Sequence, residues 1–259
     1  MRTTPAVVLK STPWQETDRI VSMFTPEYGR IRGIARGGSR SRKRFGAGLD
    51  PLTHVQMHFR SWENRDLVRL EFCEPIETFT LLRNEVLRFG MGFYFAEIIG
   101  GLFPEREANP DVFELLLWGL QKLESCDDPH GLARKFEIKV IGMAGYHPKS
   151  GACRVCGKGT GGKTNFRFLL EAGEIICPDC YNDFPGPTIT GESVAILNRV
   201  PTLGWEGLNR LRISPRVIEE LDGVISDYIR YHTGGKFRSK NFIESIRQGG
   251  QGHDQIQGI

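Results

Sequence analysis

"CRVCGKGTGGKTNF", residues 153–166, is compatible with two different folds. Gly157 to Thr164 match G-x-x-x-x-G-K-T, the phosphate-binding loop of nucleotide hydrolases, which needs a buried strand before it and a helix after it. The preceding "HPKSGACRVC" is not a buried strand, and the following "NFRFLLEAGEIIC" contains strand-like apolar pairs and no long helix. A P-loop nucleotide hydrolase therefore stays only as the less favoured alternative.

The same stretch opens with half of a cysteine pattern that is typical of zinc. Cys153 and Cys156 form one C-x-x-C pair, and Cys177 and Cys180 form a second pair about twenty residues further on. Four thiolates at this spacing fill the tetrahedral coordination of one structural ion, with no open position for water or substrate. We predict a four-cysteine zinc ribbon at residues 151–184 that holds one structural Zn²⁺.

The N-terminal part of the chain reads as strands. Its segments are short, rich in β-branched and aromatic residues, and separated by turn formers. They are "AVVLKS", "DRIVSMFT", "GRIRGIAR", "LTHVQMHF" and "DLVRLEFCE". Five short strands without intervening helices predict a small antiparallel barrel, for which the OB-fold is the best match.

Helical periodicity replaces this pattern further along the chain. Apolar residues recur at three- and four-residue steps over residues 78–103, and further helices are expected over 110–124, over "PHGLARKFEIKVIGMAGY" and from Pro215 onward. The sequence thus predicts an α+β multidomain chain. Its expected parts are an OB-fold barrel (1–79), a central and C-terminal helical domain (80–150 and 185–247), the inserted zinc module (151–184) and a disordered Gly/Gln-rich tail (248–259).

The 259-residue chain has an ordinary composition for a soluble protein, with 39% hydrophobic and 25% charged residues. No apolar run reaches the roughly 18 to 20 residues that span a bilayer. The N-terminus has no continuous apolar stretch or small-residue cleavage site, so we expect a cytoplasmic protein without a membrane partner.

The net charge of +3 is unevenly distributed. The segment "RIRGIARGGSRSRKR", residues 30–44, contains seven basic and no acidic residues, and subtracting these seven charges leaves −4 on the rest of the chain. Such a segment is either a solvated loop or a site for a polyanion, and its position on a barrel favours nucleic acid. The predicted contacts to the phosphate backbone are Arg30, Arg32, Arg36, Arg40, Arg42, Lys43 and Arg44.

The first three of these residues alternate onto one strand face, and the other four follow in a Gly/Ser-rich, flexible loop. Phe45, Phe59 and Trp62 are nearby aromatic residues that could stack on bases, although packing in a core is the commoner role. We find no spacing of carboxylates, G-x-S-x-G elbow or Cys–His arrangement that argues for catalysis, so the chain is not expected to be an enzyme.

Three further stretches carry a family likeness: "AVVLKSTPWQETDRIVSMFTPEYGRIRGIARGG", "FEIKVIGMAGYHPKSGACRVC" with the later "CPDC", and "YIRYHTGGKFRSKNFI". In this order, and over nearly its whole length, the chain resembles the RecO family of bacterial DNA repair and recombination mediators. Glu16, Asp18, Thr25 and Gly29 stand in the family's positions. The glycine-rich insert after Cys156 departs from the family pattern.

The resemblance implies an OB-fold, a helical domain and a zinc module in a nucleoid-associated protein. It implies binding to single- and double-stranded DNA, annealing of complementary strands, and help to RecR in loading RecA onto DNA coated by single-stranded DNA-binding protein. The acidic tail of that protein would dock on the helical domain, where we expect Arg134, Lys135 and Lys139 to offer charge. A zinc-ribbon/OB adaptor for RNA remains the main rival.

Overall fold

The computed structural model describes residues 1–60, 66–161, 165–180, 184–235 and 237–251, the last four of these as backbone only. The chain divides into two compact units, Met1–Cys126 with Phe237–Ile259, and Asp127–Lys236. This division differs from the expected one, because the helices of residues 80–150 and 185–247 are shared between the two units and do not form one domain.

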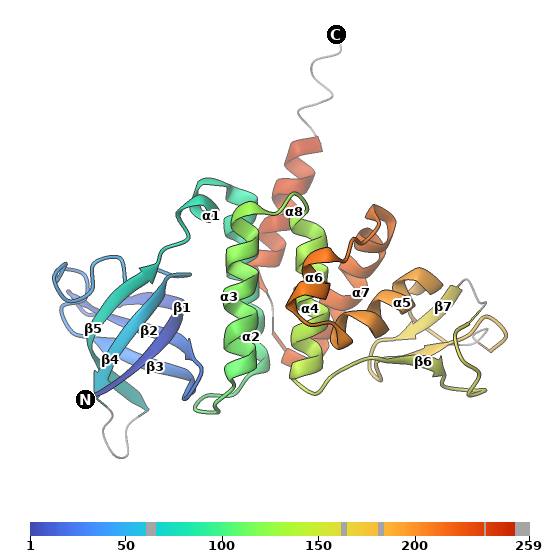
Figure 1. Cartoon of the computed structure of the whole chain (residues 1–259), viewed down its shortest axis with the longest axis horizontal. Helices are drawn as coiled ribbons and strands as arrows, with labels where there is room; N and C mark the ends of the chain where they lie inside the picture. The colour runs from blue at the N-terminus through green and yellow to red at the C-terminus, as the bar shows by residue number, and fades with distance from the viewer. Residues whose placement is uncertain (61–65, 162–164, 181–183, 236, 252–259) are drawn as a thin grey trace, which may run out of the picture. The chain divides into compact units, whose positions relative to one another are not determined.

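The first five strands close into a barrel, which confirms the OB-type fold (Figure 1). Around the barrel the order is β1-β2-β3-β5-β4, and β3 and β5 form its one parallel pair. The strands are β1 (Arg2–Trp14), β2 (Asp18–Thr25), β3 (Gly29–Ala35), β4 (His54–Arg60) and β5 (Leu67–Glu77). Closure gives each of the five strands a paired neighbour on both sides along part of its length, which limits the open sheet edge.

Strand β3 shows how the sequence sets the two faces of the barrel. Ile31, Gly33 and Ala35 are buried, whereas Arg32 between them is exposed, because successive side chains point to opposite faces of a strand. The inward residues join a core to which all five strands contribute. The alternate outward positions of β3 are Arg30, Arg32 and Ile34.

The long connection from β3 to β4 also contributes to this core. Phe45 and Leu49 are 1% and 3% exposed and pack with the inward side chains of the strands. Phe59 on β4 is buried there too, so the core role is confirmed for both Phe45 and Phe59. Trp62 lies outside the described residues.

Gly29 begins β3 in a left-handed backbone conformation that favours glycine, and it lies against the backbone of Glu107. Its φ is +59°, and a Cβ at this position would lie 1.8 Å from the carbonyl oxygen of Glu107. Nearby, Arg106 N donates to the Arg30 carbonyl oxygen at 2.9 Å. The loop around Glu107 is therefore held directly against the barrel.

The helices described in the first unit are α1 (Thr80–Asn84), α2 (Val86–Leu102), α3 (Pro110–Ser125) and α8 (Arg238–Gln251). The single helix expected over 78–103 is wrong, because the chain is extended at Glu85 (φ −116°, ψ 114°) and separates α1 from α2. Helix α8 packs on α2 and continues to Gln251, so the tail is helical where disorder is expected from residue 248. Residues 252–259 lie outside the described part.

The second unit contains the remaining helices, which are α4 (Pro129–Met143), α5 (Gly191–Arg199), the 3-10 turn η1 (Val200–Thr202), α6 (Trp205–Arg210) and α7 (Pro215–Thr233). Gly145 follows α4 with φ +83°, as expected of a C-terminal cap. Pro215 takes the first position of α7, also as predicted. Among the described residues, no helix combines the length and apolarity that crossing a bilayer requires.

A four-stranded sheet of order β6-β8-β7-β9 forms the predicted zinc module. Its strands are β6 (Lys149–Cys153), β7 (Asn165–Leu169), β8 (Glu174–Ile176) and β9 (Thr188–Thr190). The ring of Phe168 packs edge-on against Tyr228 of α7, with centroids 5.7 Å apart. The sheet thus extends beyond residues 151–184 and is anchored to the helices of its unit.

Candidate functional site

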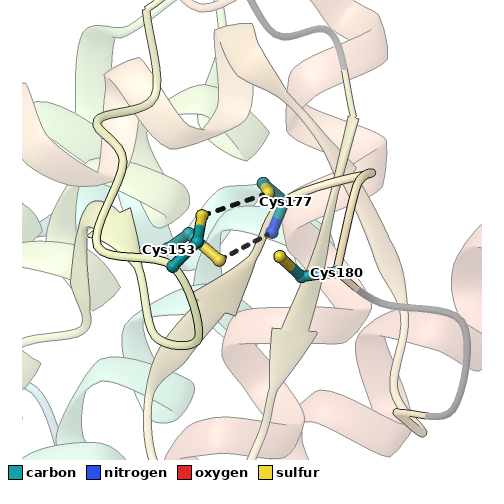
Figure 2. Close-up of side chains that lie close together, drawn as sticks. Cys153, Cys177 and Cys180 are labelled. Atoms are coloured by element: carbon teal, nitrogen blue, oxygen red, sulfur yellow. Dashed lines mark hydrogen bonds between the residues drawn. The ribbon is translucent and has the colours of Figure 1, made fainter.

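Four cysteines converge at one end of the small sheet. The Sγ atoms of Cys153, Cys156, Cys177 and Cys180 all lie within 4.8 Å of one another. In Figure 2 the sulfurs of the labelled Cys153, Cys177 and Cys180 point toward a common centre. Zn–S bonds of about 2.3 Å in a tetrahedron place sulfurs about 3.8 Å apart, and Cys156 Sγ and Cys177 Sγ are 3.7 Å apart. The cluster therefore fits a zinc ion.

The strand topology explains why the two cysteine pairs meet. β6 and β8 are parallel, so the chain leaves both strands at the same end of the sheet, once at Cys153 and once at Cys177. Each pair is closed by a tight turn, in which Gly157 N donates to Cys153 O and Cys180 N donates to Cys177 O, both at 2.9 Å. Gly157 has a φ of +67°, which its lack of a Cβ permits.

Backbone amides prepare this site for thiolates. Cys177 N donates to Cys153 Sγ at 3.3 Å. Burial raises the pKa of Cys153, but hydrogen bonds from the backbone of Cys156, Cys177 and Val155 and from the Cys156 thiol outweigh it and lower the pKa to about 6. Burial and hydrogen bonds with Cys177 and Cys156 raise the pKa of Cys180 to about 12. Four adjacent thiolates repel one another, so full ionisation requires a bound cation.

The glycine-rich insert does not have the surroundings of a phosphate loop. Strand β7 begins at Asn165, directly after the motif, where a nucleotide site requires a helix. At its other end, Gly159 forms an isolated bridge with Ala152. Residues 162–164, which include Lys163, lie outside the described part. The described residues thus support the metal interpretation of this stretch.

The two strand arginines of the basic segment are already paired. Arg32 Nε lies 2.9 Å from Glu105 Oε1, and an Nη of Arg30 lies 3.8 Å from the same oxygen. Both side chains point outward from β3 as predicted. Glu105 nevertheless offsets part of the charge that they would present to a phosphate.

The loop that follows β3 is structured, in contrast to the flexible loop expected. Gly37 N donates to Asp18 Oδ1 at 2.8 Å, and Ser39 N donates to Thr17 O at 2.9 Å. An Nη of Arg44 donates to the Arg36 carbonyl oxygen at 2.6 Å, so this guanidinium is directed toward the loop backbone. These bonds fix the backbone on which the other cations stand.

Besides Arg32, which Glu105 pairs, four cations of this segment are exposed: Arg36, Arg40, Arg42 and Lys43. None of them forms an ion pair with any residue in the described part of the chain. Lys10 of β1 is a further exposed cation. It lies in the same row as Arg32, because both pair in register with Ser22 of β2. The sequence prediction missed Lys10, although the alternation Lys10-Thr12 on one strand face could have revealed it. The resulting surface is suited to a polyanion.

The structure corrects the expectation that Arg134, Lys135 and Lys139 offer surface charge. Arg134 is 2% exposed, and its guanidinium pairs with Glu137 at 2.9 Å and with Asp222 at 2.7 Å. Lys135 and Lys139 are half-buried, and burial lowers the pKa of Lys139. Each Nζ donates to two backbone carbonyl oxygens at between 2.7 and 3.0 Å, which are those of Leu208, Leu211, Pro201 and Leu203. These cations hold the second unit together.

The comparisons with known proteins agree over most of the chain. The family model described as recombination protein O N terminal matches residues 1–79, and the one described as recombination protein O C terminal matches residues 83–241. The DNA repair protein RecO of Syntrophobacter fumaroxidans is 36% identical over 246 residues, covering 93% of this chain and 96% of its own. That of Symbiobacterium thermophilum is 30% identical over 244 residues, with the same coverage.

Proposed function

The chain belongs to the RecO family of DNA repair proteins, and from that premise we propose that it is a DNA-binding recombination mediator that anneals complementary single strands without bond-making chemistry. A role in DNA repair follows from the family itself. Annealing, the choice of partners and the absence of catalysis are the proposed details. DNA as the partner implies action at the nucleoid.

The observation that carries this proposal is the cluster of exposed cations on a structured barrel loop. Arg36, Arg40, Arg42 and Lys43 can contact phosphates without first breaking an ion pair. Two complementary strands repel each other through their phosphates, and cations that neutralise the backbone reduce this repulsion. Because such contacts do not use base edges, the bases stay available for pairing. The surface therefore suits annealing of any sequence.

Zinc is proposed as a structural ion of the second unit. The four sulfurs lie close enough together to coordinate one zinc ion tetrahedrally, and four ligands leave no position for a substrate. One cysteine pair follows β6 and the other follows β8, and each pair forms a tight turn. An ion bound to all four sulfurs would link these two turns. The ion would thus stabilise the module and take no part in a reaction.

The further partners follow from the family. We propose that the protein acts with RecR, meets single-stranded DNA-binding protein on DNA and promotes RecA loading indirectly. Since Arg134, Lys135 and Lys139 are engaged internally, we assign no residue to the acidic tail of single-stranded DNA-binding protein.

The test is strand annealing by the purified chain, with zinc measured on the same sample. We expect faster annealing of complementary oligonucleotides than in buffer alone, and about one zinc per chain. Competition between single-stranded DNA and RNA of matched sequence distinguishes the proposed function from an RNA adaptor. A DNA repair protein should prefer DNA, and an RNA adaptor should prefer RNA. Absence of both annealing and DNA binding at low salt would contradict the proposal.

A further inference from the structure

An aromatic side chain lies at the edge of the cationic surface and outside the barrel core. Trp14 is the last residue of β1 and is 50% exposed. It precedes the turn to β2 and pairs in register with Asp18. About half of the surface of this residue is therefore accessible to a ligand.

Strand register places Trp14 beside the basic segment. Trp14 lies opposite Asp18, and β3 ends at Ala35 opposite Arg19, so Arg36 begins the turn beside Asp18, whose carboxylate accepts from Gly37 N. Directly opposite residues share one face of a sheet. Trp14 and Arg36 are both exposed, and they flank the Asp18 end of β2.

The same face continues along the three strands. Lys10 and Arg32 occupy a second row, and half-buried Ile20 and Ile34 lie in the row between them and Trp14. The outer face thus has two isoleucines in its middle row. Lys10 and Arg32 lie on one side of that row, and Trp14 lies on the other side with Arg36 in the adjoining turn. The outer faces of β2 and β3 and the β1–β2 loop are where OB-type barrels bind oligonucleotides.

Hydrogen bonds join the Trp14 turn to the basic loop. Asp18 accepts from Gly37 N at 2.8 Å, and Thr17, within the turn, accepts from Ser39 N at 2.9 Å. The exposed cations of the loop and the indole thus belong to one surface. A chain of nucleotides could place phosphates on the loop and a base on the ring.

We propose that Trp14 is a base-stacking residue of a single-strand binding surface on the outer faces of β1, β2 and β3. The occupant is a single strand, because the bases of a duplex are stacked on each other and offer no free ring face. Stacking on an aromatic ring tolerates any base, which suits a protein that anneals any sequence. The inference rests on the proposed DNA binding and adds that this surface binds single-stranded DNA.

The test compares Trp14→Ala, Trp14→Leu and Trp14→Phe in the full chain. Binding is measured by fluorescence anisotropy with a labelled oligo(dT) and with a duplex of the same length. Loss of one stacked base weakens binding about fivefold to a hundredfold. We expect this loss for the single strand in the Ala and Leu variants, little change for Phe, and unchanged duplex binding. Tyr231→Ala is the matched control, since Tyr231 is 51% exposed but lies in the other unit.

The outcomes separate this inference from the proposed function. Equal losses on single strand and duplex, or no loss in the Ala and Leu variants, would overturn the role of Trp14 while leaving DNA binding intact. Binding of neither DNA form by the unmodified chain would overturn both. The Leu variant keeps the apolar bulk of the side chain without its ring face, so it decides the question if the Ala variant folds poorly.

Discussion

Replacing the four exposed loop cations by alanine should reduce the salt dependence of DNA binding. The variant carries Arg36→Ala, Arg40→Ala, Arg42→Ala and Lys43→Ala. No side chain of the four forms an ion pair within the described residues, and the bonds that shape the loop use backbone atoms, Asp18 and Arg44. We therefore expect the variant to fold with an unchanged melting temperature.

The magnitude follows from the number of phosphates that these cations can contact. Each phosphate contact on a single strand contributes about 0.7 to the slope of log K against log salt. Four contacts make about 2.8, so between 50 and 200 mM salt the unmodified protein should lose about 50-fold more affinity than the variant. Arg30 and Arg32 are left out of this number because Glu105 already pairs with them.

The assay is a titration of labelled oligo(dT) at a series of salt concentrations. The control variant removes four exposed cations from the second unit, and so has the same net charge: Arg199→Ala, Arg210→Ala, Arg212→Ala and Arg216→Ala. We expect the control to keep the slope of the unmodified chain. An unchanged slope in the loop variant, or an equal reduction in the control, would refute the assignment of this loop as the phosphate-binding site.

Further predictions concern the metal, the barrel turn, the buried ion pair and a buried thiol. Cys177→Ser should reduce bound zinc, measured by mass spectrometry of the native protein, and lower the melting temperature, while barrel binding to DNA persists. Gly29→Ala should destabilise the protein by more than about 2 kcal/mol in urea titrations, because its Cβ meets backbone atoms. Gly100→Ala in α2 should be neutral or stabilising, because an added Cβ would meet no atom within 4 Å beyond the backbone of its own helix. Glu137→Gln removes one of the two carboxylates that pair with buried Arg134 and leaves Asp222, so it should cost about 1.5–3 kcal/mol in the same titration. Burial raises the pKa of the Cys73 thiol to about 12, so its contribution to stability is full below the unfolded pKa near 9 and decreases above it by about 1.4 kcal/mol per pH unit. Cys73→Ala should remove this alkaline component of the stability profile; an identical profile in that variant would show that Cys73 is not its source.

Much of the architecture can be read from local sequence patterns. Alternation in segments such as "GRIRGIAR" predicts strands with one buried face, and the five such segments identify the barrel. The spacing of Cys153, Cys156, Cys177 and Cys180 predicts their convergence. The strand signal is local, because alternation depends on residues a few positions apart. The cysteine signal combines two local C-x-x-C pairs with a separation of about twenty residues that is typical of a zinc ribbon.

Helix boundaries are less well predicted, because packing decides them. The apolar pattern runs through Glu85 without a break, yet the chain is extended there. The polar sequence at 248–251 gives no sign of helix, yet α8 extends through it. In both cases the backbone departs from what the local sequence favours, since propensity is only a weak guide to where a helix ends.

The sequence by itself determined the barrel, the metal cluster and the presence of a concentrated basic segment. Only the tertiary structure decided which cations are available: Glu105 approaches Arg30 and Arg32 from a distant part of the chain, and Arg134 is buried against Asp222. The physical reason is that charge is a property of a residue, whereas its pairing and exposure depend on what the fold brings next to it.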